Sequence, residues 1–165
     1  MTAERVRQGT TPADKLMSVC IFIAADCELP EKPHADREHF VNFDTEDGKP
    51  YDGDPDDEYA LYPFADAEYY SGLRHGAELE WNYYTPGRAG EIIAYIGKLL
   101  SECDRVELWK VWLTDWYEYD ERPRYRKSEV SFGDLTVGDI EEITETEVWT
   151  RGQKRPTYHC LTVRK

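Results

Sequence analysis

The pattern of hydrophobic and polar positions predicts a buried strand close to the start of the chain. Residues 18–25 contain no charged side chain and are apolar at every position after Ser18. A strand that is apolar on both faces is typical of the centre of a sheet, where both faces are covered. We therefore expect this segment to be a central strand.

A second strand is predicted at Glu78 to Tyr84, where polar and apolar residues alternate. Leu79, Trp81 and Tyr83 would face the core, and the glutamates between them would face solvent. Weaker patterns of the same kind predict further strands at residues 39–43, 59–64, 106–113, 125–132, 146–149 and 157–163.

Two segments carry helix signals. Thr85 followed by Pro86 is a strong helix start, and apolar residues from Ile92 to Cys103 then recur at helical spacing. This predicts one long amphipathic helix over about residues 86–103. Thr136 and Asp139 match a capping box, which predicts a short helix over about residues 137–143.

The order of these elements predicts an α+β fold, with one mixed sheet and both helices packed on it. Strand, helix and strand between residues 78 and 113 have the size of a crossover unit, which would be parallel and right-handed if the two strands were neighbours. We expect a single globular domain over residues 17–165. Residues 1–16 are polar and aperiodic and predict a disordered N-terminal extension, with Met17 as a second possible start.

The composition supports a folded domain with its own core. The chain has 165 residues, of which 40% are hydrophobic, and it contains twelve tyrosines, five tryptophans and five phenylalanines. A chain of this length buries enough surface to fold without disulfides or metals. No apolar run approaches the length of a membrane span. The N-terminal run only loosely resembles a signal peptide, so we expect a cytoplasmic protein that does not bind membranes.

The charge is unevenly distributed. Residues 44–58 hold eight carboxylates and one lysine, which supply half of the formal net charge of -14. The last fifteen residues contain five basic side chains and no acidic one. The acidic balance argues against direct nucleic-acid binding, because phosphate contacts need clustered Lys and Arg.

The cysteines and histidines give no catalytic signature. Cys20, Cys27, Cys103 and Cys160 lack zinc or redox spacing, and we interpret them as buried free thiols. Cys27 follows a strand, where nucleophiles occur, but no base can be identified for it. The alternation of a strand places His159 and Cys160 on opposite faces. The sequence indicates no cofactor and no metal site built from these residues, and any catalytic residues remain unknown.

Two alternatives stay open. The acidic stretch at residues 52–58 resembles the opening of a calcium loop, although the EF-hand pattern fails because Asp57 and Pro63 stand at its sixth and twelfth positions. The other alternative is a small carboxylate-dependent hydrolase or a carbohydrate-binding protein. It would use Glu78, Glu80 or Glu107, possible neighbours on one sheet face near Asp115, together with Trp109 or Trp112.

Three of these strand segments resemble a family of bacterial proteins that has no assigned activity. They are residues 17–24, 79–83 and 106–113, together with Asp134-Leu135-Thr136. The resemblance spans about residues 17–163 and implies a bacterial cytoplasmic domain. It implies no functional residue.

The sequence therefore favours a non-enzymatic binding module over an enzyme. An immunity-type or inhibitor-like protein that engages a basic partner protein fits the acidic loop, and a homo-oligomer is compatible with the aromatic block at residues 109–119. The residues predicted to contact the partner are Asp52, Asp54, Asp56, Asp57, Glu58, Trp116, Tyr117 and Tyr119.

Overall fold

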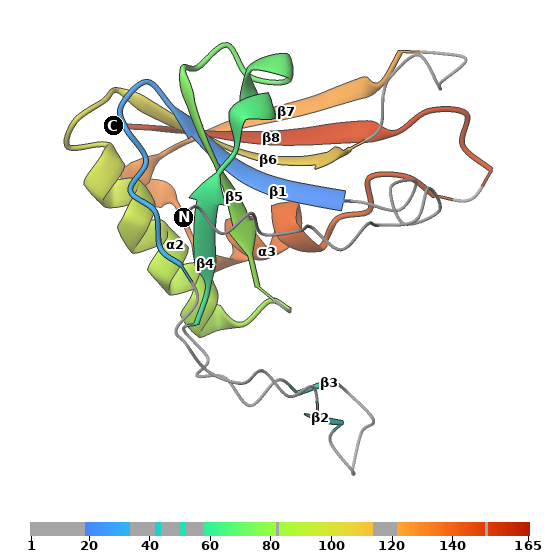
Figure 1. The fold of residues 1–165 in the computed structure, drawn as a ribbon, viewed down its shortest axis with the longest axis horizontal. Helices are drawn as coiled ribbons and strands as arrows, with labels where there is room; N and C mark the ends of the chain where they lie inside the picture. Colours follow the sequence, from blue (N-terminus) through green and yellow to red (C-terminus); the bar gives the residue numbers. More distant parts are fainter. Residues whose placement is uncertain are drawn as a thin grey trace, which may run out of the picture.

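A six-stranded mixed sheet forms the centre of the protein in the computed structural model (Figure 1). The structure describes residues 19–33, 42–43, 50–51, 58–81, 83–113, 122–150 and 152–165. The strands of the sheet, in chain order, are β1 (Val19–Ala25), β4 (Ala60–Pro63), β5 (His75–Glu80), β6 (Arg105–Trp112), β7 (Arg124–Ser131) and β8 (Thr157–Arg164). Two short strands, β2 (Asn42–Phe43) and β3 (Pro50–Tyr51), pair with each other.

The helices are α2 (Pro86–Leu99) and α3 (Val137–Glu145), and two short 3-10 helices accompany them, η1 (Ala65–Tyr69) and η3 (Phe132–Asp134). The protein is thus an α+β fold with one mixed sheet, as predicted. The first helix is shorter than expected, because the chain leaves the helix after Leu99 and continues as a turn through Cys103.

The strand order is β4-β5-β1-β6-β8-β7, and β1 is central as its apolar run predicted. All neighbouring pairs are antiparallel except β7 and β8. β5 and β6 run parallel to each other because both are antiparallel to β1, which lies between them. The segments joined by α2 are therefore in one sheet but are not neighbours. Figure 1 also shows the strong twist of the sheet, with β4 and β5 running steeply across β7 and β8.

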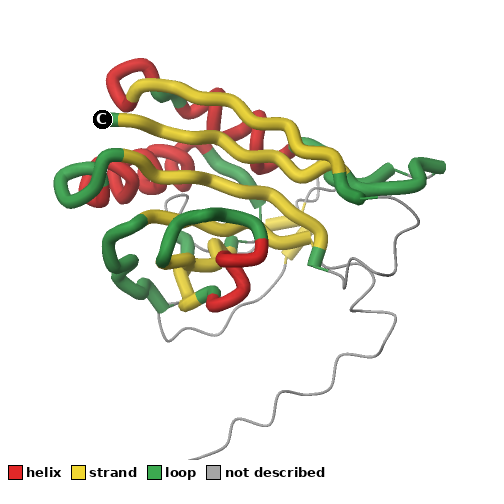
Figure 2. Tube along the Cα trace, turned by 90° about the horizontal axis from the view of Figure 1, so that it is seen from above, coloured by secondary structure: helices red, strands yellow, loops and turns green. Residues whose placement is uncertain are grey.

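Each face of the sheet has its own core. On the first face, α2 and α3 lie together against the strands (Figures 1 and 2), and Ile92 and Ile140 pack there against Ile23 and Leu108. The second face carries an aromatic cluster, in which Phe22 stacks on Trp109 at a centroid distance of 6.0 Å. Residues of β1 alternate between the two cores, which explains why its sequence is apolar throughout.

The helix starts follow the sequence signals closely. The amide of Arg88 donates to Thr85 Oγ1 at 3.0 Å, and Thr85 is the N-cap of α2. At α3 the backbone N–H of Thr136 donates to Asp139 Oδ2 at 2.8 Å, and the amide of Asp139 donates back to Thr136 Oγ1. Both the cap and the capping box predicted from the sequence are confirmed.

The bounds of one predicted strand were wrong, and another predicted strand is absent. The strand expected at Glu78 to Tyr84 begins earlier, at His75, because His75 and Gly76 pair with the end of β1. It ends at Glu80. Residues 146–149 form no strand. Val148 is instead buried in the second core, and its carbonyl accepts a hydrogen bond from the amide of Thr157.

The extension predicted at residues 1–16, and Met17, lie outside the described residues. Among the helices that the structure describes, none is both long enough and apolar enough to cross a membrane.

Candidate functional site

Most residues predicted to contact a partner lie outside the part of the chain that the structure describes. These are Asp52, Asp54, Asp56, Asp57, Trp116, Tyr117 and Tyr119. The calcium interpretation rests on the same acidic stretch and also stays a prediction. Glu58 is described; it is half-buried and stands two residues before β4.

An exposed acidic surface is present elsewhere, on α3. Glu141, Glu142 and Glu145 of this helix are exposed, as is Glu147 two residues beyond its end, and we call these four residues the α3 acidic surface. The helix contains no Lys or Arg. Glu141 and Glu145 are four residues apart, so they repel each other on one side of the helix. Acidic residues in the last turn also oppose the negative end of the helix dipole.

One cation lies close to this surface from the sheet side. Lys110 of β6 is half-buried and donates a hydrogen bond from Nζ to the carbonyl of Thr144 in the last turn of α3. Burial lowers the pKa of Lys110, and the charges of Glu145 and Glu147 oppose that shift. Lys110 therefore offsets part of the negative charge at the end of α3, while Glu141 and Glu142 point their charge to solvent.

The opposite charge gathers on the edge of the sheet. β7 is an edge strand, and Arg124, Arg126 and Lys127 on it are exposed, next to exposed Arg122. The Lys127 ammonium lies 5.5 Å from the centroid of the Trp109 ring. Glu129 lies further along the same strand and its Oε2 forms an ion pair with Arg164 Nε at 2.8 Å, so the exposed basic side chains gather only around the start of β7.

The carboxylates proposed for a hydrolase or sugar site lie on one sheet face, as the strand register requires. Phe22 pairs with Glu78 on one side and with Trp109 on the other, and Ala24 pairs with Glu107. Glu107 is occupied by structural contacts, however. Its Oε2 accepts hydrogen bonds from Ser71 Oγ at 2.6 Å and from Trp109 Nε1 at 2.8 Å.

The tryptophans of that alternative are packed rather than offered to a ligand. Trp109 is only 1% exposed, so its ring cannot serve as a platform for a sugar. Trp112 is half-buried and makes an edge contact with Trp149, at a centroid distance of 5.4 Å. Asp115 lies outside the described residues.

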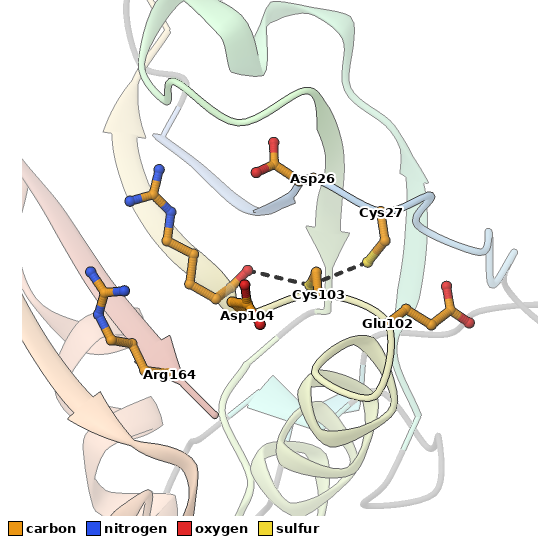
Figure 3. A pocket seen from close by; sticks show the side chains of 7 residues that line it. Asp26, Cys27, Glu102, Cys103, Asp104 and Arg164 are labelled. Carbon is orange, nitrogen blue, oxygen red and sulfur yellow. Dashed lines mark hydrogen bonds between the residues drawn. The ribbon is translucent and has the colours of Figure 1, made fainter.

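A pocket of about 390 Å³ opens at the end of the sheet where β1, β6 and α2 meet (Figure 3). It is lined by Asp26, Cys27, Glu102, Cys103, Asp104, Arg105 and Arg164. Cys27 lies in the bend after β1, and Cys103 lies in the turn after α2. Figure 3 shows their side chains directed toward each other, and their sulfur atoms are 3.3 Å apart.

Both sulfurs are held as thiols. Cys103 Sγ donates to the carbonyl of Leu99 at 3.2 Å, and Cys27 Sγ donates to Cys103. Burial and then the hydrogen bond to Cys103 raise the pKa of Cys27 to about 11, and the nearby charge of Glu102 acts in the same direction. The interpretation of these two cysteines as buried was wrong, because both are half-buried and reach a pocket.

The sequence offered no signal for this pair, since the two cysteines are 76 residues apart and only the fold brings them together. Cys20 and Cys160 are buried free thiols on the second sheet face, as predicted. Within the described residues, no group of three or more His, Cys, Asp or Glu side chains is arranged to hold a metal ion.

Comparisons with known proteins found no protein family, no curated protein and no solved structure that matches this chain. The resemblance to a bacterial protein family therefore stays an expectation from the sequence.

Proposed function

We propose that the protein is a non-enzymatic binding module that engages a basic partner protein through acidic surfaces. The observation that carries the proposal is the α3 acidic surface. Glu141 and Glu142 are exposed on a helix without a single Lys or Arg. Glu145 repels Glu141 from one turn away, and the helix dipole disfavours the charge of Glu142 in the last turn. Exposed charges that lower the stability of their own helix indicate selection for another property, here the binding of a partner.

The acidic segment at residues 44–58 supports the same function from the sequence side. Its carboxylates, like those of α3, add to the negative charge that an approaching protein would meet. Such a field raises the association rate and favours partners of opposite charge, more than it raises affinity. The partner that suits this chemistry is a protein whose basic surface normally receives phosphates, and the module would act as its inhibitor or immunity-type antagonist.

The hydrolase alternative has less support from the geometry. A catalytic carboxylate must be free to exchange a proton with a substrate, whereas Glu107 accepts from a buried serine and a buried indole. Those contacts favour a structural role for Glu107.

The proposal is tested by affinity capture from the native lysate, with the full chain as bait. Four baits are compared at low salt: the wild type, a loop variant (Asp52→Asn, Asp54→Asn, Asp56→Asn and Asp57→Asn), a helix variant (Glu141→Gln and Glu142→Gln) and a control that removes two exposed cations (Arg122→Gln and Arg124→Gln). We expect the wild type and the control to retain the same basic protein. The loop and helix variants should retain less of it.

Specificity is tested by competition with lysozyme, an unrelated basic protein, added in excess. A specific partner stays bound under this competition, and its association rate falls as salt rises because exposed charges are screened beyond about 8 Å at physiological ionic strength. Displacement by lysozyme, or equal capture by all four baits, would contradict the proposal.

A further inference from the structure

The thiols of Cys27 and Cys103 form a feature that the proposed binding function does not use. We propose that these two cysteines are a redox modification site, which closes to a reversible disulfide when the protein meets a low-molecular-weight disulfide such as oxidised glutathione. The proposal is independent of the partner-binding function, since it rests on a different end of the molecule.

The geometry of the pair carries the proposal. The sulfurs are already 3.3 Å apart, and a disulfide holds them at about 2.05 Å, so they must approach by little more than one ångström. Both segments are short connections at the ends of regular elements, the bend after β1 and the turn after α2. The amide of Cys103 donates a hydrogen bond to the carbonyl of Leu99 at 3.0 Å, and this bond keeps the turn close to the helix.

Access distinguishes this pair from the other cysteines that the structure describes. Cys27 and Cys103 line a pocket of about 390 Å³, to whose lining Arg105 and Arg164 also contribute. Cys20 and Cys160 are each 2% exposed in the second core. An oxidant in solution therefore reaches the pair and not the buried thiols.

The chemistry is two successive thiol–disulfide exchanges. One cysteine loses its proton to solvent and its thiolate attacks a sulfur of the small disulfide, so that a mixed disulfide forms and one small thiolate leaves. The second cysteine, after losing its own proton, attacks the protein sulfur of that mixed disulfide. The bond between Cys27 and Cys103 forms, the second small thiolate leaves, and both small thiolates take up protons. The protein is oxidised by two electrons, and the small disulfide is reduced to two thiols.

The acidity of the thiols sets the rate of this reaction. Because only the thiolate is nucleophilic, a pKa of about 11 for Cys27 leaves little of it reactive near pH 7. The exchange should therefore be slow at neutral pH and should accelerate about tenfold for each pH unit between 7 and 9, as the thiolate fraction rises.

The test uses the reduced, full-length protein in its native state. The protein is incubated with oxidised glutathione, quenched with acid, alkylated and examined by intact mass and peptide mapping. We expect the wild type to lose two hydrogen atoms, with a single cross-linked peptide pair that joins Cys27 to Cys103. Cys27→Ser and Cys103→Ser should each retain one glutathione instead, because the second thiol is missing. Cys160→Ala, on the other sheet face, should behave as the wild type.

Several results would overturn the inference. They are a stable glutathione adduct on the wild type, a cross-link that involves Cys20 or Cys160, or a rate that does not change between pH 7 and 9. The wild-type peptide map decides the matter even where a serine variant folds poorly, and reduction with excess dithiothreitol should restore the starting mass.

Discussion

Among single residues, the Glu107 carboxylate has the clearest structural role. It accepts hydrogen bonds from Ser71 and Trp109, which are 4% and 1% exposed. Glu107→Ala would leave two buried donors without an acceptor, and each such group costs about 1–3 kcal/mol. We expect the free energy of unfolding to fall by roughly 2–4 kcal/mol, measured by urea denaturation.

The conservative variant at the same position separates charge from hydrogen bonding. Glu107→Gln keeps an acceptor oxygen, so its loss should be about 1 kcal/mol. Glu68→Ala, at an exposed position on η1, is the control and should change stability by less than about 0.5 kcal/mol. Equal stability of Glu107→Ala and the wild type would show that the network does not support the fold.

His159 makes stability depend on pH. Burial lowers its pKa below the ordinary 6.5; a hydrogen bond to the Glu147 carbonyl and the charge of Glu142 oppose this shift, and the charges of Arg126 and Lys110 reinforce it. The unfolded chain therefore binds a proton at this residue more readily than the folded protein. Stability is fully present above about pH 6.5 and falls as the pH drops below it, by up to about 1.4 kcal/mol per pH unit.

The measurement is urea unfolding at several pH values between 7.5 and 5. His159→Gln should flatten the dependence in this window because it removes the titrating group. His75→Gln, a second histidine of the described sheet, should keep the wild-type slope because His159 is retained. An unchanged slope in His159→Gln would assign the pH dependence to other groups.

At the level of elements, Gly76 fixes how η1 lies against β5. A Cβ atom at this position would overlap Ala67 Cβ and would stand 2.8 Å from the carbonyl oxygen of Phe64. Part of that obstacle is backbone, which cannot rotate away. Gly76→Ala should therefore lower the free energy of unfolding by roughly 2–3 kcal/mol.

Gly72→Ala is the matched control, since a Cβ there meets nothing within 4 Å. Its effect on the free energy of unfolding should stay within about 1 kcal/mol, and it should be a gain, because alanine reduces the conformational freedom of the unfolded chain. Thermal unfolding followed by circular dichroism compares the two variants. Equal melting temperatures would mean that η1 moves aside without cost.

The elements also show what the sequence could predict. Local signals were sufficient for the helix starts at Thr85 and Thr136, because a cap depends on residues within one turn. The start of β5 was missed because His75 and Gly76 are strand residues only through pairing with β1. Residues 146–149 have strand-like composition, yet Val148 is buried by the second core without joining a ladder.

At the level of the whole molecule, distance along the chain limits such prediction. The placement of β1 between β5 and β6 and the meeting of Cys27 with Cys103 both depend on which segments pair across long separations. Composition and periodicity describe neighbours in sequence and carry no such information. The charge map is different, because net charge and its clusters are read directly from the residues.

The distribution of charge leads to a prediction that links stability with function. The helix variant Glu141→Gln/Glu142→Gln removes the repulsion between Glu141 and Glu145 and one charge from the last turn of α3, while Glu145 stays to favour the charged form of Lys110. We expect the variant to be more stable than the wild type by about 0.5 kcal/mol at low ionic strength, because both removed interactions are unfavourable.

The same variant should capture less of the basic partner, so that stability and binding change in opposite directions. Urea unfolding at low and at high salt measures the first effect, and the gain should shrink at high salt because the charges are exposed. Capture beside the Arg122→Gln/Arg124→Gln control measures the second. A gain in stability with undiminished capture would mean that the α3 acidic surface is not the contact. A loss of both would mean that these glutamates support the fold.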